Sequence, residues 1–141
     1  MLKKIFILIA IFSFSATLAF ATIIDQKLEQ VTANNNSFIC FFASWSKPCQ
    51  EEMIYLNSLL PAFEKKGYKI VGVSLDRKAQ DLTKFINENK IEIPIIHDKK
   101  LKTIKEYKVL IIPTLLVMDR SGKITATYID FDQNIKKSIR I

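Results

Sequence analysis

An abrupt change of pattern at residues 41–53 strongly limits how this chain folds. The apolar run Phe38–Ala43 has the length of a β-strand, and a continuous run of this kind indicates a strand buried on both faces of a sheet. Pro48 then suits the first turn of a helix. Apolar residues follow at helical spacing, namely Met53, Leu56, Leu59, Leu60 and Phe63. The sequence therefore predicts a strand-to-helix corner that carries Ser46 and Cys49.

This corner resembles the redox site of the thioredoxin superfamily, especially its extracytoplasmic TlpA-type branch. The pattern in that branch is aromatic-Trp-Ala-x-Trp-Cys-x-Pro-Cys, and residues 41–49 read Phe-Phe-Ala-Ser-Trp-Ser-Lys-Pro-Cys. Trp45, Pro48 and Cys49 match the pattern, whereas Ser46 stands where the family has its first cysteine. The resemblance implies a thiol–disulfide oxidoreductase of the cell envelope whose active-site corner is degenerate.

The replaced residue bears directly on the chemistry. Disulfide exchange begins when a thiolate attacks a sulfur atom, and the free N–H groups at a helix start lower the pKa of a cysteine there. In the family the first cysteine attacks and the second resolves the mixed disulfide. A serine hydroxyl cannot form a disulfide, so Ser46 marks the lost attacking position. Cys49 is then limited to monothiol chemistry or weak activity, unless Cys40 supplies a second thiol.

A second family-like motif is Ile112-Pro113-Thr114. The resemblance implies that Pro113 follows a cis peptide bond, faces the corner, and helps to bind substrate backbone. Together with Trp45, Lys47 and Pro48, this motif makes up the predicted substrate-binding residues. The partners implied are proteins that carry thiols or disulfides. No cofactor and no metal site is expected, because His97 is the only histidine.

The remaining pattern predicts an α/β sandwich. The resemblance implies that it is a thioredoxin-like three-layer sandwich, with a central mixed β-sheet flanked by helices. Pro61 is expected to bend or split the helix after the corner, and Gly67 to end it. The other predicted elements are a helix over 25–32, a strand over 68–75, a helix over 80–89, an extended segment over 93–96, a helix marked by Leu101, Ile104 and Tyr107, a strand over 115–118, a turn over 119–122, a strand over 123–129 and a final helix through Ile135 and Ile139.

The N-terminus has the pattern of a targeting segment. Lys3 and Lys4 precede an uncharged, mostly apolar run, and Ala19-Phe20-Ala21 offers small residues at the positions that signal peptidase reads. We expect residues 1–21 to be a signal peptide and residues 22–141 to be one thioredoxin-like domain. The alternative is a retained anchor, and only then would the protein contact the membrane. Both interpretations place the domain outside the cytoplasm, in the periplasm or anchored facing it.

The charge distribution argues against nucleic-acid binding. The formal net charge is +7, but the lysines are scattered or paired and form no long basic cluster.

Several single residues each have two possible roles. Cys49 is either reactive or an inert buried thiol, Ser46 either hydrogen-bonds the Cys49 sulfur or caps the helix, and Cys40 either packs in the core or pairs with Cys49. The resemblance also implies that Trp45 shields the corner, and that Cys40 occupies the place of a buried acid.

Two other functions stay open. Peroxiredoxins also have a Ser or Thr three residues before a reactive cysteine, as in Ser46-x-x-Cys49, but they need an arginine beside the thiolate. The chain has only three arginines, and none is clearly placed by the sequence: Arg77, Arg120 and Arg140. The remaining alternative is a non-catalytic thioredoxin-fold module that binds partner proteins through the Trp45 and Pro113 groove.

Overall fold

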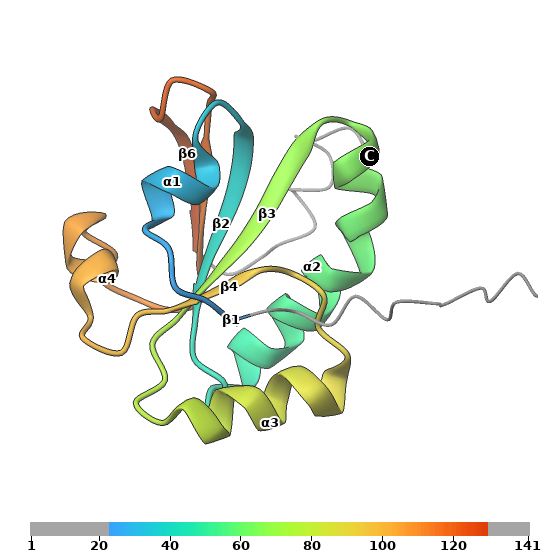
Figure 1. Cartoon of the computed structure of the whole chain (residues 1–141), viewed down its shortest axis with the longest axis vertical. Helices are drawn as coiled ribbons and strands as arrows, with labels where there is room; N and C mark the ends of the chain where they lie inside the picture. The colour runs from blue at the N-terminus through green and yellow to red at the C-terminus, as the bar shows by residue number, and fades with distance from the viewer. Residues whose placement is uncertain (1–22, 130–141) are drawn as a thin grey trace, which may run out of the picture.

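A six-stranded mixed sheet forms the centre of the molecule (Figure 1). The structure is a computed structural model, and it describes residues 23–129. The strand order is β1-β4-β3-β2-β5-β6; β1, β4, β3 and β2 run parallel, and β5 is antiparallel to both β2 and β6. The strands are β1 (Ile23–Ile24), β2 (Asn36–Phe42), β3 (Tyr68–Ser74), β4 (Ile95–His97), β5 (Thr114–Met118) and β6 (Ile124–Ile129).

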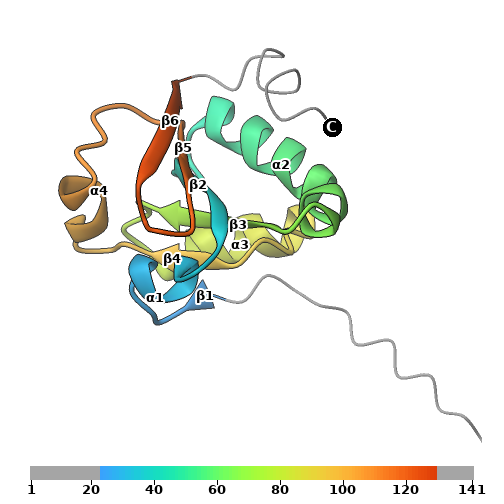
Figure 2. The same cartoon turned by 90° about the horizontal axis from the view of Figure 1, so that it is seen from above.

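Helices cover both faces of this sheet (Figure 2). One face packs against α2 (Lys47–Lys65) and α3 (Ala79–Asn89). The other packs against α1 (Leu28–Thr32) and the segment around α4 (Lys102–Glu106). The predicted α/β three-layer architecture is therefore confirmed. Within residues 23–129, no helix is both long enough and apolar enough to span a bilayer.

Strand β2 is the central, doubly buried strand that its sequence predicts. Phe38, Cys40 and Phe42 face α2 and α3, while Ile39 and Phe41 join the opposite core. None of the five side chains is more than 2% exposed. Because successive side chains of a strand point to opposite faces, an unbroken apolar run is what a strand between two helical layers requires. This burial fixes the position at which the chain leaves the sheet and enters the corner.

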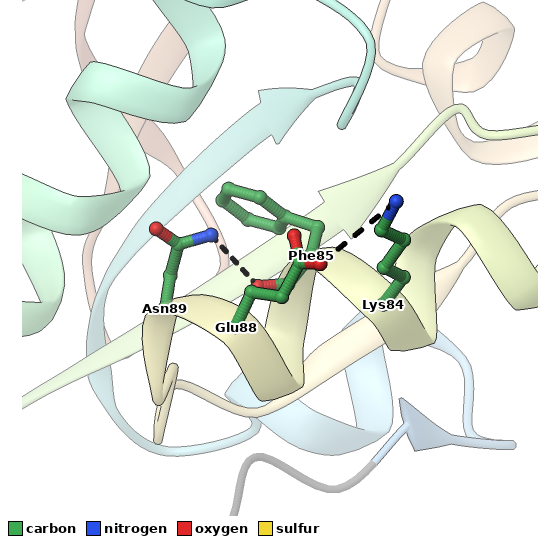
Figure 3. A network of polar contacts seen from close by, with 4 residues as sticks. All are labelled: Lys84, Phe85, Glu88 and Asn89. Atoms are coloured by element: carbon green, nitrogen blue, oxygen red, sulfur yellow. Dashed lines mark hydrogen bonds and ion pairs between the residues drawn. The ribbon is translucent and has the colours of Figure 1, made fainter.

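Helix α3 is amphipathic, and Figure 3 shows its two sides. Phe85 lies in the core with Leu82 and Ile86. On the outside, Lys84 Nζ lies 3.8 Å from Glu88 Oε1, and both side chains are mainly exposed. Asn89 Nδ2 donates to the Phe85 carbonyl at 2.9 Å, close to the end of the helix. An exposed ion pair of this kind stabilises little, so the apolar side positions α3.

The structure corrects three of the predicted elements. Strand β1 was not expected, and α1 begins at Leu28 rather than at Asp25. Helix α2 continues through Pro61, so the expected split does not occur. Pro61 is exposed near the end of α2, and water can bond to the Asn57 carbonyl that lost its helical donor. Gly67 follows α2 with a φ of 78°, as a glycine that ends a helix does.

The hairpin turn over 119–122 is confirmed. Asp119 N donates to the Lys123 carbonyl at 2.9 Å, and Gly122 has a φ of 84°. The predicted leader over 1–21 and the final helix through Ile135 and Ile139 lie outside the described residues.

Candidate functional site

The corner lies at the end of the sheet where β2, β3 and β5 meet. Phe42 closes β2, and its carbonyl accepts a hydrogen bond from Leu75 N at 2.9 Å. On the other side of β2, Phe41 pairs with Thr114. The antiparallel register therefore sets Pro113 opposite Phe42, at the start of the corner. The Ile112–Pro113 bond is cis, as the resemblance implied.

The buried carboxylate of Asp76 holds the first part of the corner. Its oxygens accept hydrogen bonds from Ser44 N at 3.1 and 3.2 Å, from Ser44 Oγ at 2.6 Å and from Ser74 Oγ at 2.6 Å. Gln50 Nε2 adds a bond to the Ser44 carbonyl at 2.6 Å. Asp76 was not among the predicted site residues. An acid directly after a doubly buried strand was the available signal, because it predicts a carboxylate at the sheet edge.

Ser46 occupies the N-cap position of α2 and is half-buried. Its backbone carbonyl accepts from Gln50 N at 2.9 Å, but its hydroxyl makes no capping bond. The Ser46 side chain acts on Cys49 instead and lowers the pKa of its thiol. This favours the role of Ser46 beside the sulfur over a capping role.

Cys49 is fully buried, with 0% of its surface exposed. Burial is the largest influence on its thiol and raises its pKa above the ordinary value of 9.0. The hydrogen bonds from Ser46 and from the Ala43 backbone act in the opposite direction, while the nearby Glu52 and Asp76 carboxylates raise the pKa further. Cys49 was left open as a reactive or an inert buried thiol, and its burial and raised pKa favour the inert thiol.

Cys40 lies in the same core, also with 0% exposure. Its pKa is raised well above 9.0 by burial first, then by Glu52 and then by Cys49. Its Sγ donates to Glu52 Oε1 at 4.0 Å. Both cysteines are free thiols in this structure, and Cys40 packs in the core, which is one of the two roles left open for it.

Glu52 is the buried acid of this site, only 6% exposed, and sequence reasoning missed it. The resemblance placed a lost acid at Cys40, but a carboxylate reaches the same region from α2. The sequence contained one indication of this: Glu52 lies on the apolar face of the helix, between Cys49 and Leu56. Burying a carboxylate there costs free energy unless it has a hydrogen-bond partner.

Exposed apolar side chains occur at the corner and in the loop before Pro113. Trp45 is 73% exposed, Leu110 is 97% exposed and Ile111 is 52% exposed. A cavity of about 490 Å³ lies beside Trp45, lined by Leu75, Asp76, Arg77, Lys78, Asp81 and Leu101. We call Trp45, Ser46, Leu110 and Ile111 the outer group, and Cys40, Cys49 and Glu52 the inner group.

The other predicted binding residues divide between these two environments. Lys47 and Pro48 are exposed, and Lys47 Nζ lies 4.0 Å from Glu51 Oε1. Pro113 and Thr114 are buried, and Thr114 Oγ1 donates to the Ile111 carbonyl at 2.6 Å. The loop before Pro113, rather than the proline motif itself, therefore supplies exposed apolar surface, and the motif pattern did not point to Leu110.

His97 has a local structural contact. Its Nε2 lies 2.6 Å from the Asp76 carbonyl oxygen, which ties β4 to the end of β3. Within residues 23–129, no three histidine, cysteine or acidic side chains are grouped closely enough to hold a metal ion.

Comparisons with known proteins match this arrangement. A profile of the AhpC/TSA family matches residues 13–127. A thiol-disulfide oxidoreductase ResA of Bacillus thuringiensis is 33% identical over 87 residues, which make up 62% of this chain and 50% of that protein. The chain thus spans about half the length of the curated relatives it matches.

Two solved structures share the fold. StoA from Bacillus subtilis superposes with a TM-score of 0.67 at 29% identity, covering 74% of this chain and 82% of that one. A protein of Chlorobium tepidum, described as a candidate thiol:disulfide interchange protein DsbE, gives a TM-score of 0.72 at 28% identity and covers 79% of both chains.

Proposed function

Because this chain belongs to the AhpC/TSA family, we propose that it is a thioredoxin-like protein of thiol–disulfide exchange, confined by its Ser46–Cys49 corner to slow, single-thiol chemistry. The observation that carries this proposal is the placement of the two residues. The half-exposed N-cap position of α2 holds the Ser46 hydroxyl, and the thiol of Cys49 in the first turn of α2 is fully buried.

The partners we propose are proteins with thiols or disulfides. Such a protein would contact the outer group, where Trp45, Leu110 and Ile111 expose apolar surface beside the corner. Reaction at Cys49 requires the first turn of α2 to open, because its Sγ is otherwise shielded. The Cys49 thiolate then attacks one sulfur of the partner disulfide, a mixed disulfide forms, and the other partner sulfur leaves as a thiolate. Ser46 cannot resolve the mixed disulfide, so turnover is slow.

A binding module without turnover is the second candidate, and the burial of Cys49 with its raised pKa favours it. The peroxidase alternative has less support. The effect of the Ser46 side chain on Cys49 suits a peroxidase. A peroxidase also needs an arginine beside the thiolate, and among the described residues no arginine shifts the pKa of Cys49. Arg77 instead lines the cavity beside Trp45.

We also propose that the domain works outside the cytoplasm, after removal of residues 1–21 or anchored by them. The N-terminal mass of the protein recovered from the envelope tests this. An intact Met1 in soluble cytoplasmic protein would contradict it.

Restoring the missing sulfur tests the proposed chemistry. Insulin reduction should be near background in the native chain and should rise more than about 10³-fold in Ser46→Cys, since loss of a nucleophile costs enzymes at least that much. Ser46→Ala is the matched control and should stay at background. Peroxide consumption is measured beside it.

Each other outcome selects a different reading. Normal insulin reduction by the native chain would show that the lost-attacker argument is wrong. Rapid peroxide turnover would favour the peroxidase. An inactive Ser46→Cys protein that remains folded would leave the binding module.

A further inference from the structure

The second buried thiol, Cys40, has no part in the chemistry proposed above. We propose that Cys40 is the resolving thiol of this chain, forming an intramolecular disulfide with Cys49 once Cys49 has reacted with a disulfide. This inference rests on the proposed function, since it needs Cys49 to react first, and it lifts the single-thiol limit because Cys40, in place of Ser46, resolves the mixed disulfide. It gives the chain a two-sulfur site made from β2 and α2, in place of two cysteines in one helix turn.

The geometry of the inner group supports the pairing. Cys40 points from β2 toward α2, and its Sγ donates to Glu52 Oε1 at 4.0 Å. Glu52 lies three residues after Cys49, on the same side of α2, where such side chains have Cβ atoms about 5–6 Å apart. Glu52 raises the pKa of both thiols, and Cys49 also raises the pKa of Cys40. Both cysteines therefore lie near the Glu52 side chain, in the part of the core that α2 covers.

The reaction balances with one external disulfide as oxidant. Cys49 loses its thiol proton and its Sγ attacks R–S–S–R′; the Cys49–S–S–R bond forms, the S–S bond of the oxidant breaks, and R′–S⁻ leaves and takes up the proton that Cys49 lost. Cys40 then gives its proton to Glu52, the acceptor that its S–H already faces, and its Sγ attacks Cys49 Sγ. The Cys40–Cys49 bond forms and R–S⁻ leaves with that proton. Two protein thiols are oxidised, and one external disulfide is reduced to two thiols.

Burial adds a kinetic signature. Both sulfurs are fully shielded, so the oxidant reaches Cys49 only in molecules whose corner has opened. The oxidation rate should therefore rise with oxidant concentration and then level off at the rate of opening. A sulfur on the surface would react at a rate that keeps rising in proportion.

The experiment treats the folded, reduced chain with oxidised glutathione, quenches it with acid, blocks remaining thiols with N-ethylmaleimide in denaturant, and measures intact mass and linked peptides. The native chain should lose the mass of two hydrogens, take up no maleimide and yield a Cys40–Cys49 linked peptide. Cys40→Ala should instead hold one glutathionyl group on Cys49. Cys40→Val, which fills the pocket, should behave like Cys40→Ala and covers the case in which the smaller side chain prevents folding.

Three results would overturn the pairing. These are a stable glutathionyl adduct on the native Cys49, a disulfide between two chains, or two unmodified thiols at every oxidant concentration. None of them depends on Ser46→Cys, whose activity with insulin tests the proposed function separately.

Discussion

The outer and inner groups of the corner differ in what they keep of a thiol–disulfide site. The outer group presents an exposed tryptophan and two exposed aliphatic side chains, but its central residue is Ser46. The inner group holds two sulfurs and a carboxylate with almost no exposure. A surface suited to partner proteins is thus retained, while the sulfur chemistry is withdrawn into the core.

This difference separates two properties that usually occur together. Binding at the surface depends on exposed apolar area, which Leu110 and Trp45 supply without any sulfur. Reactivity depends on thiolate character and access, and burial reduces both at Cys49. Variants in one group should therefore leave the property of the other group unchanged.

The largest loss of stability is expected at Asp76, whose carboxylate holds the first part of the corner. Asp76→Ala removes the acceptor of Ser44 N, Ser44 Oγ and Ser74 Oγ and leaves these donors buried. The free energy of unfolding should fall by about 3 kcal/mol, since each buried donor without a partner costs about 1–3 kcal/mol. Urea unfolding at pH 7 measures it. Asp81→Ala, an exposed acid on α3, is the control and should stay within about 0.5 kcal/mol of the native chain.

A loss of less than about 1 kcal/mol in Asp76→Ala would show that water replaces the carboxylate and that the network does not fix the corner.

The same residues show what could be predicted from the sequence. Period and composition determine β2 and α2, because these elements bury long, regular apolar patterns. The hairpin was predicted from its turn residues, since β6 has no buried residue. The cis bond before Pro113 followed from the family motif. The pKa of Cys49 could not be predicted, because it depends on the depth of burial, which no local pattern records. Glu52 and Asp76 were missed because their roles depend on contacts between elements far apart in sequence.

The pH dependence of stability should report the inner group. The pKa values of Cys40 and Cys49 are raised in the folded chain, so from about pH 9 upward the unfolded thiols lose protons that the folded thiols keep. The folded chain is therefore favoured below this range and loses stability as the pH rises through it. Each thiol contributes at most about 1.4 kcal/mol per pH unit.

Urea unfolding in reductant between pH 8 and 10 tests this sign. Cys40→Ala should lose part of the slope, whereas Ser46→Ala should keep it. Tyr107, whose pKa is raised to about 12, steepens the decline only above its ordinary value of 10.0, and Tyr107→Phe separates its share. If the free energy of unfolding changes with pH equally in the native chain and in Cys40→Ala, the pKa of Cys40 is the same in the folded and unfolded chains. Burial of Cys40 would then contribute nothing to the pH dependence of stability.

The smallest effect on stability, and the most specific test of the outer group, is expected for Leu110→Ser. Leu110 is 97% exposed, so the free energy of unfolding should stay within about 0.5 kcal/mol of the native value. In the Ser46→Cys background, KM for insulin should rise roughly fivefold with kcat unchanged, the effect of losing about 1 kcal/mol of apolar contact made equally in the ground and transition states.

Ile54→Ser is the control, because Ile54 is 43% exposed on α2 but is not part of the outer group. If Ile54→Ser raises KM as much as Leu110→Ser, exposed apolar area anywhere on the chain captures insulin. If Leu110→Ser instead lowers kcat, the loop before Pro113 acts on the reacting sulfur, and the two groups are not separable.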